Sequence, residues 1–552
     1  MEALDNFYDA AGAAAGVHGS QLKLLTCFVL SYPLGSVFVR IPKDRPALKH
    51  LFSIGVTLFF LWGMLKLWIG SLHVFGSALF TYFMAGRYRG RQMPWTVFGV
   101  VMGHLLISHW IRYMWPSDAV EISGSQMVLT MKLTTFAWNV YDGQQELESL
   151  DESQKETRIP KLPSLLEFFG YVFYFPAFLI GPSLTFTEYM ALIDETLYKD
   201  AAPASPNSSK RVPIGRKRVA YQKLVFGIGC IGAFALYGGK FSYTVTAEDW
   251  WMQKPFWYRF LYTQVMGVVQ RVRYYGAWSL TEGGCIFTGL GFNGFDKDGS
   301  ALWDKAANIN VWNIEFAPNV KVLLDNWNIN TNTWLRNSVY KRLAPPGKKP
   351  GALVTMYTFM TSAIWHGIYP GYYLTFFLGG LISSAARQVR TYIRPFFLPA
   401  LLPPKSKVLP PPTLVKQVYD VLGTVTCLAI INYMVAPFML LELRPCITAW
   451  NTLYWYGHVI VIGWLIWGQA GGFRWLGKLV KARAEKAASK EAMRVHMEME
   501  ERENKLASGM MTPGSSGGTL SILPFDVAMK GMEEAGDALK LGLARGGHAK
   551  KT

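Results

Sequence analysis

Apolar residues along this chain come in blocks long enough to cross a lipid bilayer, separated by short charged or proline-containing segments. A membrane helix needs about 20 predominantly apolar residues. Blocks of this kind lie at 22–39, 51–69, 95–115, 165–184, 221–237, 257–276, 352–377, 414–440 and 452–467. With a shorter block and an amphipathic segment added, the pattern predicts an all-α, polytopic membrane protein with about 10–11 transmembrane helices.

Four segments depart from a plain apolar span. The block 72–84 is short and is predicted to be a tilted or re-entrant piece. Segment 122–142 is amphipathic, with Lys132 in its middle, and is expected in the bundle interior or at the membrane interface. Prolines in 165–184 predict a kinked or broken helix. Segment 279–321, rich in Gly, Asn and Trp, predicts re-entrant or surface material gathered around a site.

The same pattern divides the chain into four parts. Residues 1–20 form an acidic N-terminal extension, and 21–470 form the membrane domain. From Gly471 the sequence turns polar, and charges at i,i+4 spacing predict a charged cytosolic helix over 471–507. The Gly/Ser-rich remainder, 508–552, is predicted to be a disordered tail.

Composition and charge support the membrane class. Only 17% of the 552 residues are charged, against roughly 25% in soluble domains. The net charge of +18 would suggest nucleic acid in a soluble protein, but basic cytosolic loops facing anionic lipid explain it in a membrane protein. We therefore predict a lipid bilayer as partner and no nucleic acid.

No metal site or disulfide framework is predicted. The five cysteines are widely scattered and form no CxxC pair. His104 and His109 are five positions apart, which separates them by about 140° on a helix, so they are not expected to share a metal ion.

The first candidate for chemistry is His366, the one titratable base in the apolar run 352–377. Taking an imidazole out of water is unfavourable unless it gains partners or performs chemistry. Pro370 and Gly371 follow closely and predict a helix break, which places His366, beside the aromatic Trp365, to line a cavity rather than to face lipid. The alternative is a structural histidine that hydrogen-bonds a carbonyl within the bundle, and physics alone weighs the two equally.

The second candidate is the segment 326–332, where four asparagines alternate with other residues: Asn326, Asn328, Asn330 and Asn332. Such side chains usually cap helices or form turns. In acyl transfer, one amide could instead donate to a developing oxyanion, and the spacing does not choose among the four. The basic residues that follow suit a phosphate-bearing ligand or an ordinary cytosolic loop equally well: Arg336, Lys341, Arg342, Lys348 and Lys349.

At these residues the sequence resembles a known family. The run WNINTNTWLR, followed by WHGIYPGYYLTF, is similar to the membrane-bound O-acyltransferase family. The segments SGSQMVLTMKLTTFAWNVYDG and FFGYVFYFPAFLIGPSLTFTEY resemble its lysophospholipid acyltransferase branch, particularly the broad-specificity fungal enzymes. The likeness extends from about residue 22 to residue 467, whereas the acidic N-terminus and the long tail carry none of it.

The resemblance implies a fold, a reaction and a location. The helices would surround a substrate tunnel in the endoplasmic reticulum membrane, where an acyl chain passes from acyl-CoA to the free hydroxyl of a lysophospholipid. His366 would act as general base, with a pKa kept near or below the working pH by burial, and Asn328 matches the family's catalytic asparagine. Acyl-CoA is then a co-substrate, and no cofactor or metal is required.

The resemblance also implies residues that contact the substrates. Those expected beside the catalytic pair are Trp327, Asn330, Asn332, Trp365, Tyr369, Tyr372, Arg336, Lys341 and Arg342.

Two other functions remain open at this point. The acceptor could be a sterol, a diacylglycerol or a protein on the same fold. Alternatively, the chain could transport lipid, with His366 structural, although no internal repeat or paired intramembrane charge is visible. The sequence predicts neither the lipid head group nor the oligomeric state.

Overall fold

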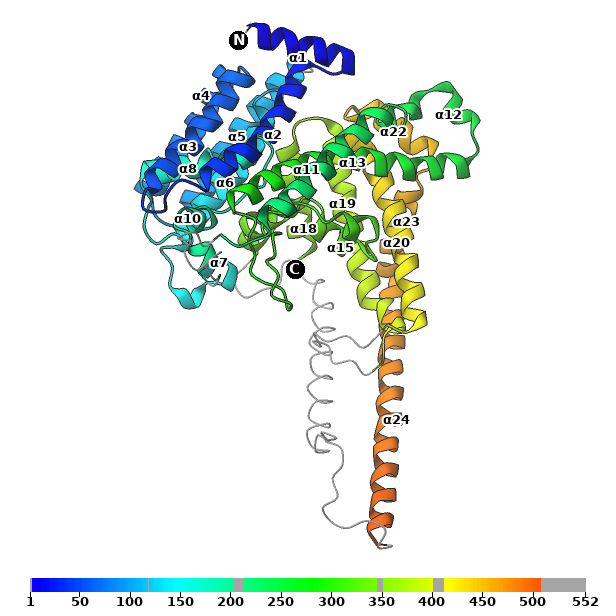
Figure 1. The fold of residues 1–552 in the computed structure, drawn as a ribbon. Helices are drawn as coiled ribbons and strands as arrows, with labels where there is room; N and C mark the ends of the chain where they lie inside the picture. The colour runs from blue at the N-terminus through cyan, green and yellow to red at the C-terminus, as the bar shows by residue number, and fades with distance from the viewer. Residues whose placement is uncertain are drawn as a thin grey trace. The chain divides into compact units, whose positions relative to one another are not determined.

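The computed structural model describes residues 2–117, 119–199, 201, 212–344, 351–400 and 412–507. These residues are helical wherever they form regular structure, and they contain two isolated β-bridges but no strand (Figure 1). The predicted all-α class is confirmed.

Seven helical segments in the described part of the chain are long and apolar enough to span a membrane. They are α2 (Gly19–Phe38), α3 with η1 (Pro46–Met64), α4 (Trp68–Arg87), α5 (Gln92–Met114), α11 (Arg216–Tyr237), α20 with α21 (Leu414–Leu440) and Tyr456–Glu501, which starts with α23. The protein is therefore polytopic. Block 72–84, predicted to be short, belongs to the full-length α4, because Trp68 to Ser71 extend that helix at its start.

Four predicted segments do not correspond to spans of this kind, which accounts for the larger number predicted from sequence: 122–142, 257–276, 165–184 and 352–377. The first, α6 (Ser123–Asp142), is buried over most of its length, so it packs in the bundle interior, one of its two predicted placements. Its Lys132 donates hydrogen bonds to the carbonyls of Tyr171 and Val172 at the end of α8 (Leu165–Val172). A cation is favourable at a helix C-terminus, which explains a buried lysine without a carboxylate.

The second, α13 (Phe256–Thr288), corrects a prediction. Residues 279–288, expected to be re-entrant or surface material, continue this helix to its end. Many of its polar residues are buried, and Glu282 is ion-paired with Lys223 of α11. Helices α11 and α13 lie alongside each other (Figure 1), and a Cβ on Gly227 would stand only 2.7 Å from Leu280 Cγ, so glycine permits their close approach.

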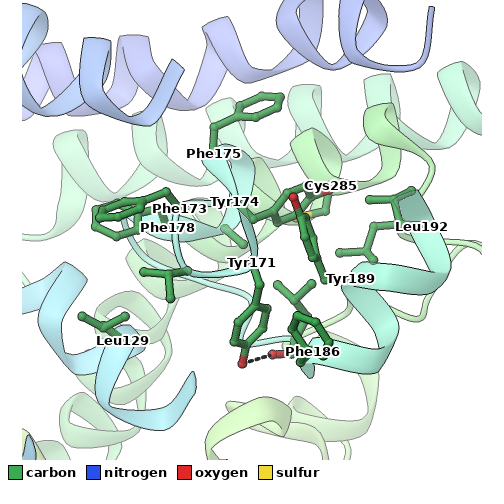
Figure 2. Packing of buried hydrophobic residues seen from close by; sticks show 14 of the residues in the cluster. Leu129, Tyr171, Phe173, Tyr174, Phe175, Phe178, Phe186, Tyr189, Leu192 and Cys285 are labelled. Carbon is green, nitrogen blue, oxygen red and sulfur yellow. Dashed lines mark hydrogen bonds between the residues drawn. The ribbon is translucent and has the colours of Figure 1, made fainter. Parts of the chain in front are cut away.

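The predicted break in 165–184 is confirmed. Helix α8 ends at Val172, and the short α9 (Phe175–Phe178) follows. The carbonyl of Phe173, freed by the break, accepts hydrogen bonds from the hydroxyls of Ser53 and Thr57 in α3. Around this break, aromatic side chains of α8, α9 and α10 (Phe186–Ile193) form a buried core (Figure 2). Neighbouring protein thus satisfies the irregular backbone, as a membrane interior requires.

The N-terminal extension is helical in the structure. Helix α1 (Glu2–Ala15) places Asp5 in ion pairs with Lys23 of α2 and with Lys66. These ion pairs hold residues 2–15 against α2 and the segment that contains Lys66.

The chain divides into two units. The first comprises Met1–Pro399 and Pro404–Lys478, and the second comprises Ala400–Pro403 and Leu479–Thr552. The boundary predicted at 470 falls in η7 (Gly468–Gly472), where Gly471 has φ 125°. Helix α24 (Phe473–Ala507) begins there and carries the predicted charged segment. The predicted tail, 508–552, lies outside the described residues, as do Lys348 and Lys349.

Candidate active site

His366 is the last residue of α18 (Ala352–His366). The chain turns at Gly367, whose φ of 137° lies in the region that favours glycine. Helix α19 (Pro370–Tyr392) then starts with proline in its first turn. The predicted break is confirmed, but it begins directly after His366, and Pro370 opens the next helix rather than ending this one.

The His366 ring is held by aromatic packing. Its centroid lies 5.0 Å from that of Phe376, with the rings nearly parallel, and 5.0 Å from that of Phe438, edge to face. Within the described part of the chain its nitrogens form no hydrogen bond. The neighbouring histidine differs, because His109 Nε2 donates to the Trp365 carbonyl at 3.1 Å. His366 thus does not match the carbonyl-bonded alternative, and its nitrogens are free to meet a ligand.

His366 lines a cavity of about 1430 Å³ with a mostly apolar wall. The wall is formed by α18, α19, α15 (Val320–Asn326), α16 (Ile329–Trp334), η5 (Leu335–Tyr340), η6 (Arg394–Phe397), α20 (Leu414–Met434) and α23 (Tyr456–Trp467). Five of the residues predicted from sequence line it: His366, Trp327, Asn328, Asn332 and Arg336. Pockets for a single small ligand measure about 300–1,000 Å³, so this cavity has room for more than one.

Asn328 has a left-handed backbone, with φ 46° and ψ 57°, at the start of α16. Asparagine tolerates this conformation better than most residues. Its side chain does not cap the helix. Instead its Oδ1 accepts a hydrogen bond from Asn308 Nδ2 at 3.2 Å. Uncommon backbone conformations cluster at functional sites, and this one places the amide against the cavity.

The structure distinguishes the four asparagines, which the spacing in the sequence leaves equivalent. The amide nitrogens of Asn326 and Asn332 donate to backbone carbonyls of α15, at 2.8 and 2.9 Å. That of Asn330 donates to Asn308 at 2.8 Å, and Asn330 does not line the cavity. Among the described residues, Asn328 is therefore the one of the four whose NH₂ group has no acceptor. It is free to donate to a ligand.

Three aromatic residues that were predicted to contact the substrates lie behind the cavity wall and do not form part of it. Trp365 is buried, and its Nε1 donates to the Met127 carbonyl of α6 at 2.9 Å. Tyr369 packs on Tyr113 of α5. Tyr372 packs against the His366 ring at 5.6 Å between centroids. These residues hold α18 and His366 in place, and none of them lines the cavity.

Lys341 and Arg342, predicted to meet a phosphate, are ion-paired elsewhere. Arg342 binds both carboxylate oxygens of Asp142 at 2.8 and 2.5 Å, and Lys341 lies 2.7 Å from Asp151. Partial burial raises the pKa of Asp151, but hydrogen bonds from Lys341 and from the Gln154 backbone outweigh it, so this pKa lies below its usual value. The carboxylate is ionised at neutral pH and keeps Lys341 away from the cavity.

Sequence reasoning missed three arginines that line the cavity together with Arg336: Arg387 and Arg390 of α19, and Arg394 of η6. The i, i+3 spacing of Arg387 and Arg390 places them on one face of α19, a signal that the sequence contains. None of these four arginines forms an ion pair with another described residue. At 1.5 Å per residue, Arg387 lies roughly 25 Å along α19 from its start beside His366. The cavity thus combines a distant cationic region with the His366 and Asn328 side chains.

Asn308 and Phe376 were also missed. Asn308 lies in the segment 279–321, and its contact with Asn328 agrees with the prediction that part of this segment gathers around the site. Phe376 is one of many apolar residues in 352–377, and no sequence signal distinguishes it.

Comparison with known proteins places this chain among relatives of one family. Residues 121–402 match the model of the membrane-bound O-acyltransferase family. The chain is 40% identical over 452 residues to a lysophospholipid acyltransferase of Schizosaccharomyces pombe, which covers 81% of this chain and 86% of that protein. It is 37% identical over 463 residues to a lysophospholipid acyltransferase of Saccharomyces cerevisiae, covering 81% and 73%. It is 34% identical over 407 residues to human membrane-bound glycerophospholipid O-acyltransferase 1, covering 71% and 77%.

Proposed function

The chain belongs to the membrane-bound O-acyltransferase family, and we propose that it is a lysophospholipid acyltransferase that moves an acyl chain from acyl-CoA to the free hydroxyl of a lysophospholipid. The observation that carries this proposal is the cavity in which the side-chain nitrogens of His366 and Asn328 have no hydrogen-bond partner among the described residues. The names of the fungal relatives support the acceptor class. We further propose that the protein resides in the endoplasmic reticulum membrane.

The two side chains suit the two electrostatic demands of acyl transfer. His366 accepts the proton of the lysophospholipid hydroxyl while the hydroxyl oxygen attacks the thioester carbonyl. Negative charge then develops on the carbonyl oxygen, and Asn328 Nδ2–H donates to it. When the carbon–sulfur bond breaks, the imidazolium returns the proton to the thiolate of coenzyme A. The product phospholipid, which contains the new ester, then leaves the cavity, and His366 is neutral again.

The cavity wall supports two lipidic substrates. Its mostly apolar surface and volume of about 1430 Å³ suit two acyl chains. The hydrophobic effect favours transfer of such chains from water by about 0.8 kcal/mol per methylene. Expulsion of water also protects the thioester from hydrolysis.

Purified protein in lipid nanodiscs tests the proposal directly. Labelled acyl-CoA is supplied with a panel of lysophospholipids, and the acylated product is followed by mass spectrometry. We expect phospholipid and free coenzyme A in equal amounts. Acylation of diacylglycerol, a sterol or a peptide, but of no lysophospholipid, would contradict the acceptor class. Movement of lipid between leaflets without consumption of acyl-CoA would contradict the enzyme.

The arginines of α19 are proposed to bind the phosphates of acyl-CoA. Arg390 is exposed and lines the cavity with Arg387 and Arg394. Hydrogen bonds to charged groups contribute about 1.5–3 kcal/mol, so Arg390→Ala is expected to raise KM for acyl-CoA by about tenfold, since 1.4 kcal/mol corresponds to tenfold. Because the contact is the same in ground and transition states, kcat should stay within about twofold.

Arg444→Ala is the matched control, because Arg444 is exposed but lies outside the cavity. Its KM is expected within about twofold of wild type. The measurement is initial rate against acyl-CoA concentration at two ionic strengths, since the arginine effect should weaken in high salt. Equal KM values for the Arg390 and Arg444 variants would contradict phosphate binding at α19.

A further inference from the structure

We infer that Asn308 is a positioning residue that fixes the orientation of the Asn328 amide, so that the NH₂ group of Asn328, and not its oxygen, faces the cavity. The inference rests on the proposed function, because it concerns the donor assigned there to the oxyanion. It adds a residue from a separate segment of the chain, 18 positions before the first residue of the asparagine run that the sequence singled out (326 − 308).

The orientation of the Asn308 amide follows from its contact with the backbone. The Asn330 backbone N–H donates to Asn308 Oδ1 at 3.0 Å. A backbone N–H can only donate, so the atom that it meets must be an oxygen. The Asn330 side chain donates to the same oxygen at 2.8 Å. The other end of the Asn308 amide is therefore its NH₂ group.

That NH₂ group in turn orients Asn328. Asn308 Nδ2 lies 3.2 Å from Asn328 Oδ1 and donates to it. If the Asn328 amide were rotated by half a turn, two NH₂ groups would face each other without an acceptor between them, which is unfavourable in a partly buried site. Asn328 Oδ1 is therefore held against Asn308, and its NH₂ group is left for the cavity that Asn328 lines.

The backbone holds Asn308 in place independently of its side chain. The Asn308 carbonyl accepts from the Ile329 N–H at 2.9 Å, and Ile309 forms an antiparallel bridge with Trp327. The Asn310 N–H also donates to the Asn326 carbonyl at 3.1 Å. Asn308 as a whole residue is only 5% exposed. A substitution that keeps the shape of Asn308 is thus expected to leave this pairing of segments intact.

Asn308→Asp tests the inference with an isosteric change. The carboxylate keeps an acceptor for the Asn330 N–H but removes the donor to Asn328 Oδ1. The Asn328 NH₂ group should then turn toward the carboxylate and present its oxygen to the cavity. Because loss of an oxyanion donor lowers kcat by about 10²–10³-fold, a reversible misorientation is expected to lower kcat by about 10–100-fold. KM for acyl-CoA should stay within about threefold.

Asn313→Asp is the matched control in the same segment. Asn313 Nδ2 donates to Asn326 Oδ1 at 3.2 Å, an equivalent asparagine pair that does not line the cavity. Its kcat is expected within about twofold of wild type. If Asn308 were merely structural, both variants would lower the melting temperature and the yield of folded protein, and kcat of the folded fraction would not change.

A double-mutant cycle completes the test. Because Asn308 acts through Asn328, the variant carrying both Asn308→Asp and Asn328→Ala should be no slower than Asn328→Ala alone. Wild-type kcat in Asn308→Asp, or losses that multiply in the double variant, would overturn the inference while leaving the proposed function standing. A wild-type protein that transfers no acyl chain to any lysophospholipid would overturn the proposed function and the inference together.

Discussion

His366→Ala is expected to lower kcat for acyl transfer to a lysophospholipid by about 10²–10⁴-fold, the range that general base catalysis contributes. Without the imidazole, the acceptor hydroxyl must attack the thioester while keeping its proton. The ring packs against Phe376 and Phe438, so its removal also leaves a space in the wall. KM for acyl-CoA should change little, since the arginines of α19 are untouched. The measurement is product formation by the purified variant at saturating acyl-CoA.

His458→Ala is the matched control for this experiment. His458 is also a partly buried histidine with aromatic neighbours, and its Nδ1 lies 2.6 Å from the Tyr433 hydroxyl. It does not line the cavity. We expect a lower melting temperature and a kcat within about threefold of wild type. If His366→Ala and His458→Ala lose activity to the same extent, His366 has a structural role and is not the base.

The sequence predicts most helices because an apolar run of about 20 residues is the length that a membrane-spanning helix requires. The prediction fails for helices that are surrounded by other helices and not by lipid, because such helices can carry polar residues that find partners in the protein. The end of α13 contains Ser279, Thr281 and Glu282, and by composition it resembles surface material. In the structure these side chains face neighbouring helices, and Glu282 pairs with Lys223. Such a partner lies 59 positions away (282 − 223), so no local pattern can reveal it.

At the site, the sequence predicts which residues are present better than it predicts which way their side chains point. His366 and Trp365 are adjacent, and successive residues on a helix point about 100° apart. The break after His366 does not say which of them faces the cavity, and the structure turns Trp365 to α6. The sequence leaves Arg342 available for a phosphate, because its ion-pair partner, Asp142, is 200 positions away and no local pattern reveals the pair. Long-range pairing of this kind decides which basic residues remain available.

Asn328→Ala is expected to lower kcat by about 10²–10³-fold, the cost of removing one donor to an oxyanion. The methyl side chain of alanine leaves Asn308 Nδ2 without its acceptor and the cavity without the amide NH₂ group. Alanine is also less suited to the left-handed backbone at this position, where φ is 46°. Asn328→Asp separates the two effects, because aspartate tolerates this backbone and still accepts from Asn308 but cannot donate. It is expected to be as inactive as the alanine variant while melting at a temperature closer to wild type.

Asn326→Ala provides the control within the same run of asparagines. The Asn326 amide donates to an α15 carbonyl and does not line the cavity. Its loss should cost about 1 kcal/mol of stability, the net value of one hydrogen bond, and leave kcat within about threefold. Rates measured at saturating substrate on equal amounts of folded protein then rank the two positions. The four asparagines are alike in sequence. If the kcat loss of the Asn326 variant equalled that of the Asn328 variant, the run of asparagines would have a structural role. The oxyanion donor would then have to come from another residue of the cavity.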